Sequence, residues 1–269
     1  MITRPRIMKI NNDEQKIGIL DSGIGGFSIY SSARELLPKE DIIYVADKKY
    51  FPYGEKSEDV IRERVNALVA FLKDEGATVI VVACNTASVI ALEYVRKKHP
   101  DIPIIGTVPA IKSATEKTRN GNMGVLCTPG TAKSTYQKDL IKKYAIGKNM
   151  YVQVFPGLVE AIEENNIDKI DLAKLFGALN KKNIDTLVLG CTHFPLIKKE
   201  IADVLSDAQI SILDSGEAIA RQVQRILATH EKEGVGKTIF YTTAKPEMFD
   251  IMVSRYLGVS EKSKLVEVC

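Results

Sequence analysis

Residues 77–86 read ATVIVVACNT, and residues 186–193 read TLVLGCTH. Each stretch is a mostly apolar run that ends in a cysteine followed by hydrogen-bonding side chains. Runs that are apolar on both faces are typical of parallel strands covered by helices on both sides of the sheet. We therefore predict two central parallel strands, at 77–84 and 186–191, each with a cysteine at its carboxyl end.

Similar runs recur along the chain and alternate with helical stretches. They lie at 16–20, 41–47, 103–108, 124–128 and 210–214. One helix is expected after the glycine-rich turn DSGIGG (21–26), and it should stop at Pro38. Another should begin after an N-cap at Ser57 and end at Gly76. Strands that alternate with helices indicate βαβ units and a doubly wound α/β fold.

The chain also repeats itself once. Three pairs of polar residues at predicted strand ends are each separated by 107 positions: Asp21 and Thr128, Cys84 and Cys191, Thr107 and Asp214. We infer two similar doubly wound α/β domains with parallel sheets, related by a pseudo-twofold axis. Ligands of open α/β sheets bind outside the carboxyl ends of the strands. The active site is therefore expected in the cleft between the domains, with Cys84 and Cys191 on opposite walls.

Composition narrows the class of protein. The 269 residues are 45% hydrophobic and 26% charged, with a formal net charge of +3. The basic residues are scattered, so we expect no nucleic-acid partner. No apolar stretch has transmembrane length and the N-terminus has no secretory apolar core, so we expect no membrane association. The four cysteines form no CxxC pair, which favours a reducing cytoplasm.

Two facing thiols are suited to proton transfer. Inversion of a stereocentre beside a carboxylate needs a base on one face and an acid on the other, and a thiolate is a good base near neutral pH once its pKa is lowered. Helix N-termini after each strand would supply positive potential. Hydrogen-bonding groups follow both cysteines, and the carboxylate of Asp21 is available to orient groups or relay protons.

Other interpretations are weaker. A single strand-end cysteine is more often a core residue, as we expect for Cys127, whereas Cys269 is expected to be a frayed end. Zinc could take Cys84, Cys191 and His193, but the spacing is unusual and no fourth ligand is evident, so we predict no metal.

A nucleotide-binding site is also weakly supported. DSGIGG departs from the dinucleotide fingerprint, which would need glycine at the position of Ser28, and Asp47 alone is a weak signal. The glycines of DSGIGG would instead let the backbone approach a small ligand. With no P-loop pattern either, we expect no cofactor.

Five segments together resemble the glutamate racemases of the aspartate/glutamate racemase superfamily. They are DSGIGG (21–26), PYG (52–54), ACNTAS (83–88), GCTHFPL (190–196) and FYTTAKPEMF (240–249). The resemblance runs from about Ile17 to Gly258. It implies a cofactor-independent racemase that supplies D-glutamate for peptidoglycan and forms a homodimer. It also implies that the last helices return to the first domain, which gives domains at 1–111 plus 220–269 and at 112–219.

The resemblance also implies residue roles. Cys84 would take the α-proton from D-glutamate and Cys191 from L-glutamate, with Asp21 and His193 as auxiliary acid/base groups. The implied substrate contacts are Asp21, Ser22, Tyr53, Gly54, Asn85, Thr86, Thr128, Thr131, Thr192 and His193. Glu160 is placed at the family's glutamate, although residues 152–165 lack the family's Cys-Pro.

Alternatives to this function stay open at the level of sequence. They are an aspartate racemase or related carboxylate isomerase, a non-catalytic binding protein of the same fold, and a nicotinamide-dependent dehydrogenase.

Overall fold

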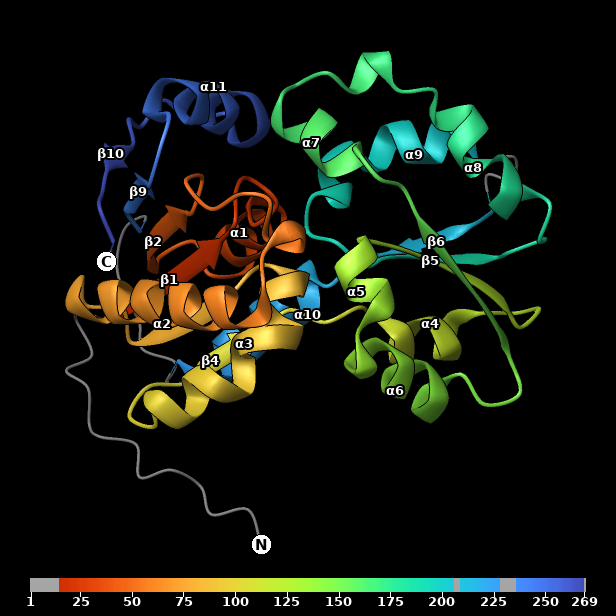
Figure 1. The fold of residues 1–269 in the computed structure, drawn as a ribbon, viewed down its shortest axis with the longest axis horizontal. Coiled ribbons are helices and arrows are strands. Elements are labelled where there is room, and N and C mark those ends of the chain that lie inside the picture. Colours follow the sequence, from red (N-terminus) through yellow and green to blue (C-terminus); the bar gives the residue numbers. More distant parts are fainter. Residues whose placement is uncertain (1–14, 206–208, 228–235, 269) are drawn as a thin grey trace, which may run out of the picture.

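Two parallel sheets organise the chain (Figure 1), as the computed structural model of residues 15–205, 209–227 and 236–268 shows. The first sheet has six strands in the order β10-β9-β2-β1-β3-β4 and the second has four in the order β6-β5-β7-β8. All pairings are parallel. The predicted α/β class is therefore confirmed.

The strands of the described residues are β1 (Lys16–Asp21), β2 (Asp41–Ala46), β3 (Val79–Val82), β4 (Ile104–Gly106), β5 (Asn122–Cys127), β6 (Asn149–Val154), β7 (Thr186–Leu189), β8 (Ser211–Leu213), β9 (Thr238–Thr242) and β10 (Lys264–Leu265). Seven of these ten strands fall close to their predicted positions. The internal repeat is also confirmed, because β2-β1-β3-β4 and β6-β5-β7-β8 have the same order along the chain and across the sheet. We call the part around the six-stranded sheet the first half and the part around the four-stranded sheet the second half.

Helices connect the strands. The α-helices are α1 (Phe27–Leu36), α2 (Glu58–Asp74), α3 (Asn85–Lys98), α4 (Ile111–Lys117), α5 (Pro129–Lys133), α6 (Thr135–Tyr144), α7 (Leu158–Glu163), α8 (Leu172–Asn180), α9 (Lys198–Val204), α10 (Gly216–Ile226) and α11 (Pro246–Leu257). Short 3-10 turns are η2 (Tyr53–Glu55), η3 (Ile167–Lys169) and η4 (Phe194–Ile197).

The signals that predicted α1 and α2 act as expected. The Ser57 hydroxyl accepts a hydrogen bond from the Val60 amide, which satisfies a free donor in the first turn of α2. Gly76 has φ +90°, a left-handed conformation that glycine adopts without steric cost and that ends the helix. The helix after DSGIGG ends at Leu36, two residues before Pro38.

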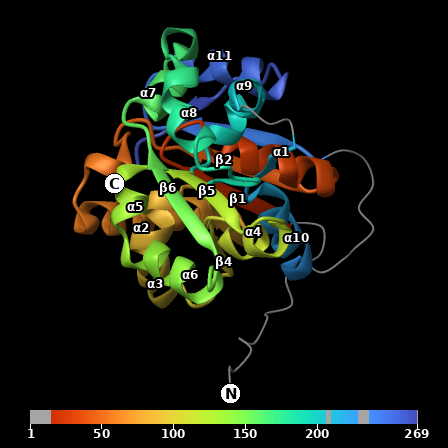
Figure 2. The same cartoon turned by 90° about the vertical axis from the view of Figure 1, so that its right-hand side faces the viewer.

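Three strands were not predicted, and each lies at or near a sheet edge. β6 is an edge strand with no fully buried residue, so it lacks a continuous apolar run. Figure 2 shows it passing between α7 and α8 on one side and α5 and α6 on the other. β9 and β10 extend the first sheet beyond β2. The C-terminal segment thus returns to the first half through strands as well as helices.

Sheet positions determine burial. β1 and β3 lie inside the first sheet and are almost fully buried, as is β7 in the second.

Within the described residues, no helix combines the length and apolarity needed to cross a membrane. The predicted domain boundary between residues 219 and 220 falls inside α10, a helix that packs against α1. Cys269 lies outside the described residues.

Candidate active site

A cleft of about 200 Å³ opens at the carboxyl ends of the central strands of both sheets. Most of the predicted site residues line it: Ser22, Tyr53, Gly54, Cys84, Asn85, Thr86, Thr128, Glu160, Cys191, Thr192 and His193. Residues of both halves therefore share one cavity, as the repeat predicted. Further apolar walls come from Phe51, Pro52, Phe155, Pro156 and Val159.

The two thiols occupy equivalent places in the two halves. Cys84 follows β3 and Cys191 follows β7, two residues beyond the last strand residue in each case. Both are nearly buried, with 7% and 6% of their surface exposed. Their local structure differs, however. Cys84 is the N-cap of α3, whereas Cys191 precedes the short 3-10 turn η4, so the predicted helix N-terminus is present only at Cys84.

Few polar groups contact Cys84. Ser22 Oγ lies 3.8 Å from Cys84 Sγ and is placed to donate to it. Burial raises the pKa of the Cys84 thiol to about 12, and the negative charge of Asp21 adds to this effect. Asp21 is itself fully buried, and burial raises its pKa as well. Its Oδ2 accepts from the Gly23 amide, while Oδ1 has no hydrogen-bond partner among the described residues.

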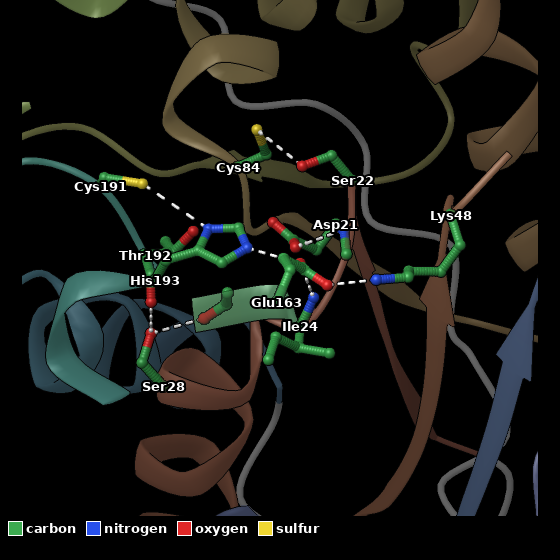
Figure 3. Close-up of polar contacts among 12 residues, drawn as sticks. Asp21, Ser22, Ile24, Ser28, Lys48, Cys84, Glu163, Cys191, Thr192 and His193 are labelled. Atoms are coloured by element: carbon green, nitrogen blue, oxygen red, sulfur yellow. Dashed lines mark hydrogen bonds and ion pairs between the residues drawn. The ribbon is translucent and has the colours of Figure 1, made fainter. Parts of the chain in front are cut away.

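Cys191 lies at the end of a chain of charged groups (Figure 3). His193 Nδ1 is 3.7 Å from Cys191 Sγ, and His193 Nε2 is 2.6 Å from Glu163 Oε1. Burial alone would lower the pKa of His193, but the hydrogen bonds to Cys191 and Glu163 raise it well above its usual value. Burial alone would raise the pKa of Glu163, but His193 and Lys48 bring it to about 2. Both shifts favour the imidazolium and carboxylate forms of the pair.

Glu163 was missed by the sequence analysis, which selected Glu160. Both lie on α7, three residues apart, and so on the same side of the helix. Glu160 lines the cleft, whereas Glu163 is buried beneath it and contacts His193. The spacing of three was the one available signal, but it could not decide which carboxylate turns toward the histidine.

Glu163 also joins the two halves. Its Oε1 accepts a hydrogen bond of 2.7 Å from the Ile24 amide in the first half. Its Oε2 forms an ion pair with Lys48, which follows β2.

Two further contacts join the halves. Ser28 Oγ donates to the Thr192 carbonyl at 3.0 Å, and the hydroxyls of Thr86 and Thr128 are 3.3 Å apart. The chain of polar contacts around the cleft thus crosses from one half to the other.

The glycines of DSGIGG have a different role from the one predicted. A Cβ at Gly23 would lie 1.8 Å from Glu163 Oε1, and a Cβ at Gly25 would lie 2.4 Å from His193 Nδ1. The backbone of the first half therefore makes room for side chains of the second half. The prediction that these glycines admit a ligand is wrong for these two positions.

Asp47 is a structural residue. It is fully buried and accepts hydrogen bonds from Tyr53, Arg64 and Thr243, at 2.7 to 2.9 Å. Its carboxylate therefore fixes Tyr53, which lines the cleft. This arrangement leaves no carboxylate oxygen directed at a ribose, and it explains the acidic residue after the second strand without a nucleotide.

Some predicted residues lie behind the cleft. Thr131 is fully buried, and its hydroxyl accepts from Thr128, so it supports a lining residue. The third repeat pair is structural as well. Thr107 is buried and donates to the Val82 carbonyl, whereas Asp214 accepts from the Gly216 amide and pairs with Lys198.

Within the described ranges, no cluster of three or more histidine, cysteine or acidic side chains has an arrangement that could hold a metal ion.

The sequence of this chain is similar to those of known proteins. Residues 18–223 match the Asp/Glu/Hydantoin racemase family. A glutamate racemase of Pseudomonas paraeruginosa is 38% identical over 259 residues, which cover 94% of this chain and 97% of the relative.

Solved structures are similar too. A glutamate racemase of Escherichia coli, in complex with L-glutamate and the activator UDP-MurNAc-ala, superposes with a TM-score of 0.81 at 37% identity and covers 90% of this chain and 95% of its own. One from Francisella tularensis, in complex with D-glutamate, has a TM-score of 0.80 at 30% identity and covers 95% of this chain and 98% of its own.

Proposed function

Because this chain belongs to the Asp/Glu/Hydantoin racemase family, we propose that it is a glutamate racemase that interconverts L- and D-glutamate. The observation that carries the proposal is the pair of buried thiols, at equivalent strand ends, in one cleft. Related enzymes with bound L- and D-glutamate support the choice of substrate.

The reaction is a two-base proton transfer at Cα. With L-glutamate, the Cys191 thiolate takes the α-proton, so the Cα–H bond breaks and an S–H bond forms. The electron pair left on Cα is delocalised into the adjacent substrate carboxylate. The Cys84 thiol then gives its proton to the opposite face and is left as a thiolate. With D-glutamate the two cysteines exchange roles, and no cofactor takes part.

Neighbouring residues prepare the thiols. The His193 imidazolium, paired with Glu163, is placed to stabilise a thiolate at Cys191, because a nearby positive charge favours that form. Asp21 is the corresponding auxiliary group beside Cys84, where Ser22 and the start of α3 provide donors. Glu160 remains a predicted auxiliary residue in the wall of the cleft.

Hydrogen-bonding groups of the cleft bind the substrate. Asn85 Nδ2 is buried and has no hydrogen-bond partner among the described residues, so it is available to a substrate carboxylate. The other proposed contacts are Ser22, Tyr53, Gly54, Thr86, Thr128, Thr192 and His193, with Thr131 acting through Thr128.

The cellular setting is part of the proposal. We place the enzyme in the cytoplasm as a homodimer that supplies D-glutamate for peptidoglycan. Its domains would comprise residues 1–111 plus 220–269 and residues 112–219.

Circular dichroism of L-glutamate incubated with the protein, without added cofactor, tests the function. The signal should decay to zero as the racemate forms, and early product in deuterium oxide should carry deuterium at Cα mainly in the D enantiomer. L-aspartate should lose its signal far more slowly. A stable L-glutamate signal, or faster decay with L-aspartate, would contradict the proposal.

A further inference from the structure

Lys48 connects the first half to the charged groups beside Cys191. It follows β2, and its ammonium forms an ion pair with Glu163 Oε2. Only 12% of its side chain is exposed, compared with 2% for Glu163. The same ammonium lies 5.2 Å from the ring centre of Phe51, which lines the cleft. Figure 3 shows Lys48 and His193 on opposite sides of the Glu163 carboxylate.

The carboxylate of Glu163 has one fixed orientation because each oxygen has its own partners. Oε1 accepts from His193 Nε2 and the Ile24 amide, and Oε2 contacts Lys48. Without Lys48, Oε2 would be a buried anionic oxygen without its cation, and the side chain could rotate to regain a partner. Such a rotation would move Oε1 away from His193, whose other nitrogen contacts Cys191.

We propose that Lys48 is a positioning residue of the racemase: it holds Glu163 so that His193 stays directed at Cys191, and it ties this group to the opposite half of the molecule. The inference rests on the proposed function for its catalytic consequence. Lys48 contacts neither thiol in the described structure, and Glu163 and His193 link it to Cys191, so we assign its effect to that face of the substrate.

Adjacent lysines provide a matched pair of variants. K48M removes the ammonium and keeps most of the apolar stem, and K48R retains the charge. K49M is the control, because Lys49 is 59% exposed and its ion-pair partner Glu267 is at 3.8 Å and also exposed. We expect K48M to lower kcat for glutamate by about 10-fold with KM within about 2-fold, since misplaced catalytic groups cost rate rather than binding. K48R should recover most of the loss, and K49M should stay within about 2-fold of the wild type.

A double-mutant cycle separates positioning from a general structural role. In the E163Q background, K48M should change kcat by less than about 2-fold, because the group that Lys48 positions has already been altered. If K48M leaves kcat within 2-fold of the wild type, or lowers it by the same factor in both backgrounds, the proposal is overturned. K48Q serves as the second variant if K48M does not fold, with the same two criteria.

Alkylation of the resting protein gives a readout that is independent of turnover. Iodoacetamide labelling, with peptide mass mapping, reports Cys84 and Cys191 separately. K48M should slow labelling of Cys191 several-fold and leave Cys84 within about 2-fold. If the wild type does not racemise glutamate, the proposed function fails, yet this labelling pattern still decides whether Lys48 acts through Glu163 on His193. Equal slowing at both cysteines, or at neither, would overturn the positioning role.

Discussion

The two halves of this molecule present the same element to the cleft in two different settings. In each half the first strand along the chain, β1 or β5, pairs with a buried strand, β3 or β7, and a cysteine follows two residues after that strand. Around Cys84 the close polar groups are a serine hydroxyl, a buried carboxyl and the start of α3. Around Cys191 they are an imidazolium, a carboxylate and, one step further, an ammonium.

This difference shows what a repeated fold determines. Repetition places two thiols at equivalent strand ends, which is the symmetry that a reaction between mirror-image substrates needs. However, the other groups on Cα of the substrate differ from one another, so the cleft that holds them is not symmetric. The groups that surround each thiol therefore need not match. The Cys84 side has a hydroxyl donor and a helix N-terminus, whereas the Cys191 side has an ion pair and an amide hydrogen bond that cross between the halves.

Loss of either thiol should have the largest effect. C84A and C191A should each lower the rate of racemisation by about 10²- to 10⁴-fold, because each removes a general acid/base from one face. Polarimetry with both enantiomers measures this. C127A is the control: Cys127 is fully buried in β5 and is not among the lining residues of the cleft, so turnover should stay within about 2-fold. Near wild-type turnover in either cleft variant would rule out the two-thiol reaction.

E163Q should have the next largest effect and should act on the Cys191 side alone. Removing the charge that keeps His193 protonated should lower kcat by about 10- to 100-fold, with KM changed much less. Labelling of Cys191 by iodoacetamide should slow, while that of Cys84 should not. The matched control is E164Q, since Glu164 is the exposed neighbour on the same segment and its carboxylate accepts a hydrogen bond from the Asn166 side chain, away from His193.

The same variant tests pH dependence. The folded-state pKa of Glu163 is about 2, below its usual 4.5, so its contribution to stability is present above pH 4.5 and is lost as pH falls toward 2. This contribution is up to roughly 3 kcal/mol. Denaturant unfolding between pH 5 and pH 2 should therefore show a steeper loss of stability in the wild type than in E163Q. Parallel curves for the two proteins would contradict this assignment.

G23A should reproduce part of the E163Q effect without removing any charge. The added methyl group would overlap the Glu163 carboxylate, which is the flexible end of a side chain and would be displaced. We expect about a 10-fold loss of kcat with a modest loss of melting temperature. G177A is the control, because a Cβ at that position in α8 meets no atom within 4 Å, and alanine is the better helix former. Unchanged kcat in G23A would show that the carboxylate can shift without consequence.

S22A should have the smallest effect and should act on the Cys84 side. The contact between Ser22 Oγ and Cys84 Sγ is long, at 3.8 Å, so its loss should cost only a few-fold in kcat. Labelling of Cys84 should change more than labelling of Cys191, the opposite of the pattern expected for E163Q. The same pattern in both variants would mean that the two sides are not independent.

The sequence alone predicted the architecture well, for physical reasons. Buried parallel strands require apolar residues on both faces, so the central strands stood out as continuous runs, and the shift of 107 positions revealed the repeat. It did not predict β6, because an edge strand with half-exposed residues has no such run. It also identified eleven of the nineteen lining residues of the cleft, because strand ends and the family resemblance pointed to them, whereas most of the apolar wall carried no such signal.

What the sequence determined by itself is the pair of thiols and the sheets that carry them, since both depend on local runs and their spacing. Only the tertiary structure decided which groups surround each thiol. Glu163 and Lys48 are 115 positions apart and come from different halves, so no local pattern joins them. The glycines of DSGIGG make the same point: their lack of side chains is visible in the sequence, but the carboxylate and imidazole that fill that space arrive only when the two halves meet.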